Sequence, residues 1–141
     1  MSVKSLTVIA VVVAVVALSA GGPLSTGVGG YIDGPLLVAG DHYRTNFDAL
    51  VGGQLELDGD CLLLDGHPAI WPVGTTWDDD AVNVPGVGRV ELGDTVVGGG
   101  GWVDVHSVGR SHGSLTAAVA GLCSSNGQVR LLQTNLRRGN D

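Results

Sequence analysis

Short apolar runs separated by turn-forming residues fill the middle of the chain. Leu55, Glu56 and Leu57 alternate between apolar and polar side chains, which is typical of a strand with one buried face. Residues 61–64 form a continuous apolar run, as expected for a buried strand. An Asp-Gly pair follows each segment, and this dipeptide favours the tight turns that connect antiparallel strands. The same pattern predicts further strands over 69–71, 82–84, 87–92, 95–97 and 102–105.

Four consecutive glycines, 98–101, separate two of the predicted strands. Glycine runs of this kind occur where a strand bulges or turns a tight barrel corner. Several short strands at regular spacing, with Gly-rich turns between them, are typical of a small barrel or sandwich. We therefore predict an all-β fold, an OB-like, partly open barrel of about five or six strands.

Residues 114–123 allow two interpretations. The Ala-Ala-Val-Ala sequence favours a helix, whereas the alternation of Leu115, Ala117 and Val119 with small residues permits a strand. The turn-like sequence at 124–127, just before an apolar run at 128–133, is typical of a β-hairpin. Because a hairpin requires a strand on both sides of its turn, we favour a strand over 114–123.

The chain divides into four predicted parts. Residues 1–20 combine Lys4, an apolar run over 6–18 and small residues after it, which is the composition of a signal peptide. The run falls short of the ~20 residues of a membrane-spanning helix, so a cleaved signal peptide is favoured over an uncleaved anchor. A Gly-rich tether follows over 21–46, with a candidate edge strand at 35–39. The barrel domain is predicted over 47–135 and a polar tail over 136–141.

Cys61 and Cys123 are the only cysteines. In an exported chain such a pair predicts a disulfide bond. Closing a loop of this length would stabilise the fold by about 4 kcal/mol in the chain-entropy treatment. The spacing does not match a CxxC motif, so a redox-active pair is not expected.

The charge balance excludes two classes of partner. The chain has fourteen Asp and Glu residues and seven Lys and Arg residues, which gives a net charge of −7. Nucleic acid binding depends on Lys and Arg neutralising phosphates, so no nucleic acid partner is expected. An anionic membrane surface is unfavourable for the same reason, and contact with a membrane is expected only through residues 1–20 if they remain uncleaved.

Residues 109–113, Gly-Arg-Ser-His-Gly, match the G-x-S-x-G pattern of a nucleophile elbow formally. In that fold an acid and then a histidine follow the serine, whereas only Asp141 and the adjacent His112 follow Ser111. Short glycine patterns also arise easily in a chain with 24 glycines. A small serine hydrolase that uses Ser111, with His106 or His112, is therefore retained only as the alternative function.

The remaining candidates are weak. Asp78, Asp79 and Asp80 form a candidate weak cation site, although Val82 and Asn83 break the EF-hand pattern and a solvated turn explains the acids as well. His67, Asp104, His106 and His112 lack the close spacing of a metal site, so no metal and no cofactor are expected. A candidate ligand face comprises Trp71, Trp77 and Trp102, for which packing in the core is the alternative.

The chain contains the motifs Cys61-Leu62, Trp71-Pro72-Val73-Gly74-Thr75, Gly93-Asp94-Thr95-Val96 and the glycines at 99–101, followed by a late cysteine, Cys123. Together these motifs resemble an uncharacterised group of small exported bacterial OB-like β proteins. This resemblance covers about half of the chain and implies an exported OB-like domain; it transfers no catalytic residue. We thus expect a non-catalytic binding or structural module of the cell envelope, secreted or anchored, whose ligand the sequence does not name.

Overall fold

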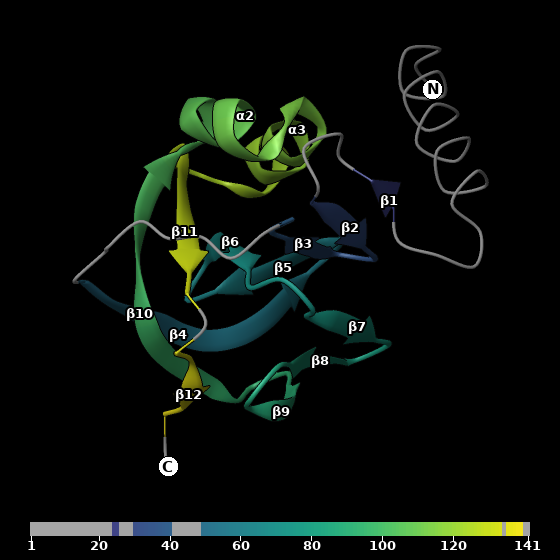
Figure 1. Ribbon diagram of the computed structural model, residues 1–141, viewed down its shortest axis with the longest axis vertical. Coiled ribbons are helices and arrows are strands. Elements are labelled where there is room, and N and C mark those ends of the chain that lie inside the picture. Colours follow the sequence, from purple (N-terminus) through teal and green to yellow (C-terminus); the bar gives the residue numbers. More distant parts are fainter. Residues whose placement is uncertain (1–23, 26–29, 41–48, 134, 140–141) are drawn as a thin grey trace.

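The computed structural model describes residues 24–25, 30–40, 49–133 and 135–139. The predicted leader, 1–20, lies outside the described residues. Figure 1 shows a strand-rich body with two short helices against one end of it.

Five strands close into a barrel: β4 (Ala49–Asp58), β5 (Cys61–Leu64), β6 (His67–Trp71), β10 (Thr95–Asp104) and β11 (Gln128–Leu132). Around the barrel the order is β4, β5, β6, β11, β10 and back to β4, with β6–β11 as its one parallel pair. In chain order this is the Greek-key arrangement of an OB barrel. The predicted OB-like barrel is confirmed, and the pairing of β5 with β6 makes it closed rather than partly open.

Strand alternation fills the inside of the barrel with apolar side chains. Successive side chains of a strand point to opposite faces, so every second residue of β4, β5 and β6 points inward. The resulting barrel core consists of Leu36, Val38, Val51, Leu55, Leu62, Leu64, Ala69, Trp71, Val82, Val84, Val90, Val96, Leu132 and Leu136. Leu136 belongs to the predicted polar tail, and β12 (Arg137–Arg138) just after it pairs with β10.

The segment before the barrel adds strands to β6. A hairpin of β2 (Tyr31–Asp33) and β3 (Leu36–Val38) joins the sheet because β3 runs parallel to β6, and β1 (Leu24–Ser25) pairs with β2. The candidate edge strand at 35–39 is β3, which lies between β2 and β6 and is fully buried. This part of the predicted tether is therefore packed into the folded body.

A small antiparallel sheet connects β6 to β10. It contains β7 (Thr76–Asp78), β8 (Ala81–Val84) and β9 (Gly88–Glu91), which lie at the end of the barrel opposite the helices (Figure 1). Val82, Val84 and Val90 contribute to the barrel core from this sheet. Thr75 begins the connection with a buried hydroxyl that donates to the Pro72 carbonyl oxygen at 2.6 Å.

Two helices cover the outer face of β3, β6 and β11. They are α2 (Val105–His112) and α3 (Ser114–Cys123). A second cluster, the helix core, lies between the helices and the sheet and consists of Leu37, Ala39, Ile70, Val108, Ala120, Val129 and Leu131. The predicted strand over 114–123 is wrong: helix propensity prevails, and the turn at 124–127 leads from α3 into β11.

Asp104 ends β10 and caps α2. Its Oδ1 accepts a hydrogen bond from the Ser107 backbone N–H at 2.7 Å, as a good N-cap residue does. This bond lowers the pKa of the Asp104 carboxyl, because the charged form is the better acceptor. Val105, predicted as the end of a strand, is therefore the first residue of a helix.

The glycine run lies within one continuous strand. Residues 98–101 belong to β10, which Figure 1 shows as a long, strongly curved ribbon, so the predicted division into two strands is wrong. The glycines allow other backbone segments to approach closely. A Cβ at Gly100 would lie 2.1 Å from the Leu131 carbonyl oxygen and 2.6 Å from Val51 Cγ2, so β11 and β4 both approach β10 there.

The predicted disulfide bond is confirmed. Cys61 at the start of β5 is bonded to Cys123 at the end of α3, with a Cα–Cα distance of 5.5 Å. The bond joins residues 62 positions apart, which corresponds to about 4 kcal/mol of chain-entropy stabilisation. It fastens the helical layer to the barrel.

We expect Gly100→Ala to lower the free energy of unfolding by about 2 kcal/mol, because the added methyl group overpacks a site between three strands. Urea titration followed by circular dichroism measures the change. Gly109→Ala is the matched control: it lies within α2, and its added Cβ would have its nearest neighbour at 3.5 Å. That variant should gain about 0.5–1 kcal/mol from helix propensity. Equal stability of Gly100→Ala and the wild type would contradict this account of the curved strand.

Candidate functional site

A cluster of polar and aromatic side chains lies at the end of the barrel where β10 leads into α2. Trp102 on β10 pairs across the sheet with Arg130 on β11, and Arg130 pairs with Ala69, two residues after His67. Alternation places all three side chains on the inner side, in line with the barrel-core residues of their own strands. We call Trp102, Arg130, His67 and Asp65 the barrel-end cluster.

The cluster is organised around the Trp102 ring. The Arg130 guanidinium carbon lies 4.5 Å from the centroid of that ring, within cation–π range. The His67 ring meets it edge to face, with centroids 4.9 Å apart and an interplanar angle of 89°. The Trp102 residue nevertheless remains 44% exposed. An aromatic surface is thus held rigidly by two polar partners and still faces solvent.

Asp65 is placed by the turn between β5 and β6. It adopts a left-handed φ of 48°, and its Oδ1 accepts a hydrogen bond from the Gln54 backbone N–H at 2.8 Å. A Cβ at Gly53 would lie 2.6 Å from Asp65 Cγ and 3.0 Å from Arg130 Nη1, so both side chains approach β4 at this glycine. Among the described residues, however, Asp65 and Arg130 form no ion pair within 4.0 Å.

Two nitrogen atoms of the cluster are buried without a hydrogen-bond partner in the described part of the chain. They are Nδ1 of His67 and Nε of Arg130. Leaving such a group unsatisfied costs about 1–3 kcal/mol. Burial lowers the pKa of the Arg130 guanidinium, and the charge of Asp65 acts in the opposite direction. The cluster therefore contains unused hydrogen-bonding capacity beside an exposed tryptophan.

The structure does not bring the three tryptophans together into one ligand face. Trp71 is 1% exposed and belongs to the barrel core, so it cannot contribute to an exposed face. Trp77 is half-buried on β7 and packs against the barrel core, where its backbone N–H donates to Asp33 Oδ2 at 2.9 Å. Of the three, Trp102 alone belongs to the barrel-end cluster.

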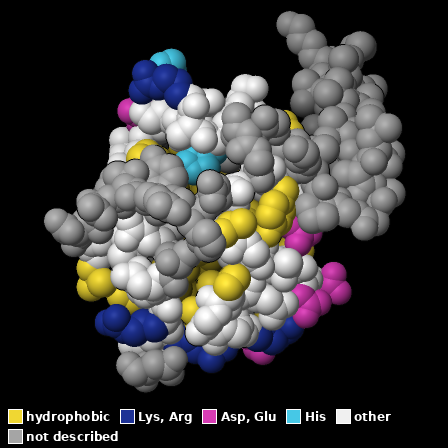
Figure 2. Space-filling view, viewed as in Figure 1, with side chains coloured by type: hydrophobic (Ala, Val, Ile, Leu, Met, Phe, Trp, Pro, Cys, Tyr) yellow, Lys and Arg dark blue, Asp and Glu magenta, His cyan; other side chains and the backbone are white. Residues whose placement is uncertain are grey.

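The candidate cation site at Asp78, Asp79 and Asp80 is occupied by an arginine. The guanidinium of Arg89 bonds to the Asp78 carboxylate and to Asp80 Oδ1 at 2.9 Å, and it lies 3.6 Å from Glu91 Oε1. Figure 2 shows acidic side chains gathered over β7. Within the described ranges no group of three or more metal-binding side chains is present. The acidic turn is thus a surface ion-pair network.

Ser111 lies inside α2 and not at a strand–turn–helix elbow. Its hydroxyl donates to the Ser107 carbonyl oxygen at 2.9 Å, and Oγ lies 2.7 Å from His112 Nδ1. A serine hydroxyl carries one proton, so the bond to the Ser107 carbonyl oxygen competes with donation to Nδ1, which a general base requires. Burial lowers the pKa of His112, which lies at the buried end of the helix.

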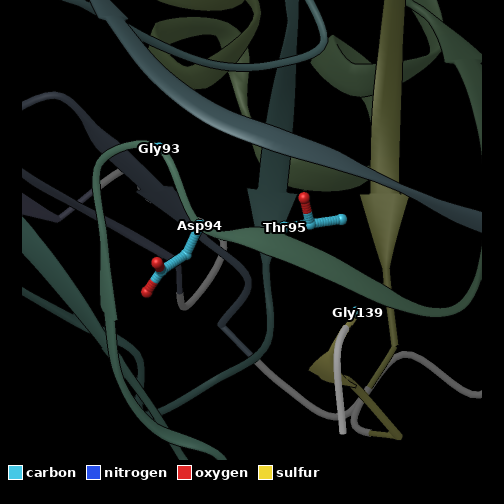
Figure 3. Close-up of a pocket in the computed structure, with 4 residues that line it drawn as sticks. All are labelled: Gly93, Asp94, Thr95 and Gly139. Carbon is cyan, nitrogen blue, oxygen red and sulfur yellow. The ribbon is translucent and has the colours of Figure 1, made fainter.

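A hollow of about 340 Å³ lies beside the turn that precedes β10. It is lined by Gly93, Asp94, Thr95 and Gly139, and Figure 3 shows the Asp94 and Thr95 side chains pointing apart. The Asp94 carboxylate is already used, since its Oδ2 accepts from the Glu91 backbone N–H at 2.9 Å. The hollow therefore offers a ligand few polar groups that the turn does not already use.

Sequence reasoning missed Arg130 and Asp65, and it considered His67 only as a metal ligand. Arg130 lies between the apolar residues Val129 and Leu131 in the sequence, and this position could have indicated the face on which its side chain projects. A charged residue flanked by two residues that face one core must project on the opposite face. The partner ring of Trp102 could not be identified without the pairing register.

No family model matches the chain, and neither a curated protein nor a solved structure gives a significant match. The resemblance to small exported bacterial proteins stays a prediction. Within the described residues, no helix has the length and apolar character needed to cross a membrane.

Proposed function

We propose that this protein is an exported, non-catalytic binding module of the cell envelope, which holds its ligand at the barrel-end cluster. The observation that carries the proposal is the partly exposed Trp102 ring, which contacts Arg130 and His67 at the end of a closed barrel. Rigid aromatic side chains with polar neighbours are typical anchors of binding sites.

The export part of the proposal is supported by the sequence and by the disulfide bond. Residues 1–20 have the composition of a signal peptide, and they resemble no part of a soluble core. The Cys61–Cys123 bond belongs to a class that persists in oxidising compartments. The resemblance to small exported proteins supports the same compartment.

The non-catalytic part rests on the chemistry of the cluster. Trp102, Arg130, His67 and Asp65 include no hydroxyl or thiol nucleophile, and the Asp65 carboxylate bonds to the β4 backbone, where it fixes a turn. The alternative, a serine hydrolase, draws support from the 2.7 Å contact between Ser111 and His112. The helical setting of Ser111 and its competing bond to the Ser107 carbonyl oxygen favour the binding role over hydrolysis.

Export predicts that the chain is recovered outside the cytoplasm with its disulfide bond intact. Fractionation of the native host, followed by mass spectrometry with and without reduction, measures both properties. We expect alkylation of Cys61 and Cys123 only after reduction, because the two sulfur atoms are bonded. N-terminal sequencing of the same sample distinguishes a cleaved leader from an anchor. Recovery in the cytoplasm with two alkylatable thiols would overturn the export proposal.

Binding at the cluster predicts that the purified, disulfide-bonded protein co-sediments with protein-free envelope fragments. Trp102→Ala should weaken this association by at least about tenfold, as loss of a central aromatic anchor of ~2 kcal/mol does. Leu122→Ala is the matched control, because Leu122 is 86% exposed on α3 and does not belong to the cluster. Thermal unfolding confirms that both variants fold. Equal binding by Trp102→Ala and the wild type would remove the cluster from the proposal.

A further inference from the structure

The Arg130 side chain projects from a buried strand into the barrel end, and at least one of its hydrogen-bond donors has no partner among the described residues. Its neighbours Val129 and Leu131 face the helix core, which forces the Arg130 side chain to the barrel side. A guanidinium carries five N–H donors in a planar fork. In the described part of the chain, Nε is buried and lacks a hydrogen-bond partner. The guanidinium carbon lies over the Trp102 ring, 4.5 Å from its centroid.

A partly desolvated charge of this kind requires compensation. The cation–π contact with Trp102 compensates part of the charge, and Asp65 adds a favourable charge at longer range. The Asp65 carboxylate already accepts from Gln54 and does not reach ion-pair distance within the described residues. What is missing is an oxygen acceptor at the guanidinium itself, and a carboxylate fits the fork by accepting two parallel hydrogen bonds.

His67 supplies a second unused group beside the same ring. Its Nδ1 is buried without a partner in the part of the chain that the structure describes, and its ring contacts Trp102 edge to face. In the tautomer with the proton on Nδ1, this atom donates a hydrogen bond. Because Nδ1 of His67 and Nε of Arg130 are both buried, the groups left for a ligand are the terminal N–H groups of Arg130 and the exposed part of the Trp102 ring. A ligand that combines a negatively charged oxygen with a ring matches these two side chains.

Asp65 limits the charge that the site accepts. Its carboxylate and Arg130 Nη1 both approach the same point of β4, at Gly53. A second negative charge on the ligand would therefore face a carboxylate as well as the arginine, and like charges repel each other. The arrangement favours a single negative charge over a double one. A sugar acid carries one charge at neutral pH, whereas a sugar phosphate monoester carries almost two.

On the basis of the proposed function, we infer that the barrel-end cluster binds a carboxylate-bearing sugar, with the carboxylate on Arg130 and the sugar ring against Trp102. The proposed site uses one arginine, although the protein as a whole is acidic. Recognition of the carboxylate therefore depends on local contacts and not on net charge.

Isothermal titration of the full folded chain with glucuronate, glucose and glucose 1-phosphate tests the inference. We expect glucuronate to bind at least about tenfold more tightly than glucose, which corresponds to about 1.4 kcal/mol, because only glucuronate forms a charge-assisted contact with Arg130. Glucose 1-phosphate should bind more weakly than glucuronate because of Asp65. Raised salt should weaken glucuronate binding to the wild-type protein, and this measurement requires no variant.

Arg130→Gln should reduce glucuronate binding to the level of glucose, and Arg130→Lys should give an intermediate affinity, because it keeps the charge and loses the fork. Arg137→Gln, an exposed arginine on β12, is the matched control and should bind as the wild type does. Glucuronate affinity equal to that of glucose, or unchanged in Arg130→Gln, would overturn the inference. If both sugars bind equally and Trp102→Ala abolishes both, the proposed function survives without the anion. If neither sugar binds and the protein fails to sediment with envelope fragments, both fail.

Discussion

The close approach of β10 to two neighbouring strands is the constraint on which the rest of the structure depends. At Gly100 the backbone of β11 and the side chain of Val51 on β4 occupy the space that any Cβ would need. This contact lets one long strand curve enough to pair with β4 over its first half and with β11 over its second. The curvature closes a five-strand barrel, and the closed barrel fixes which side chains meet at its end.

Closure also separates the apolar residues into two cores. Alternate residues of β3, β6 and β11 face either the barrel or the helices, so Trp71 and Ile70, neighbours in sequence, belong to different cores. The disulfide bond ties the helical layer to β5. Arg130 is the residue whose neighbours fill the helix core while its own side chain enters the barrel end. The site is therefore a consequence of strand alternation in a layer that is buried on both faces.

The fold class could be predicted because the alternation of Leu55–Leu57 and the Asp-Gly turns depend only on nearby residues. The disulfide followed from the number of cysteines. The strand predicted over 114–123 failed because the turn at 124–127 can follow either a strand or a helix; helix propensity prevails, and Ala120 packs against the sheet from α3. The barrel-end cluster could not be predicted, since it depends on the register that pairs Trp102 with Arg130 and Arg130 with Ala69. From the sequence, Trp71 was as good a candidate for the ligand face as Trp102, yet Trp71 is buried.

The central claim is that the Arg130 guanidinium lies over the Trp102 ring while its Nε has no hydrogen-bond partner among the described residues. Nuclear magnetic resonance of the arginine side chains tests it directly, because a guanidinium over an aromatic face experiences the ring current of that face. We expect the Arg130 side-chain proton signals to lie upfield of those of the exposed Arg137, and to return to ordinary positions in Trp102→Leu. Arg130 signals that coincide with those of Arg137 in the wild type would contradict the account.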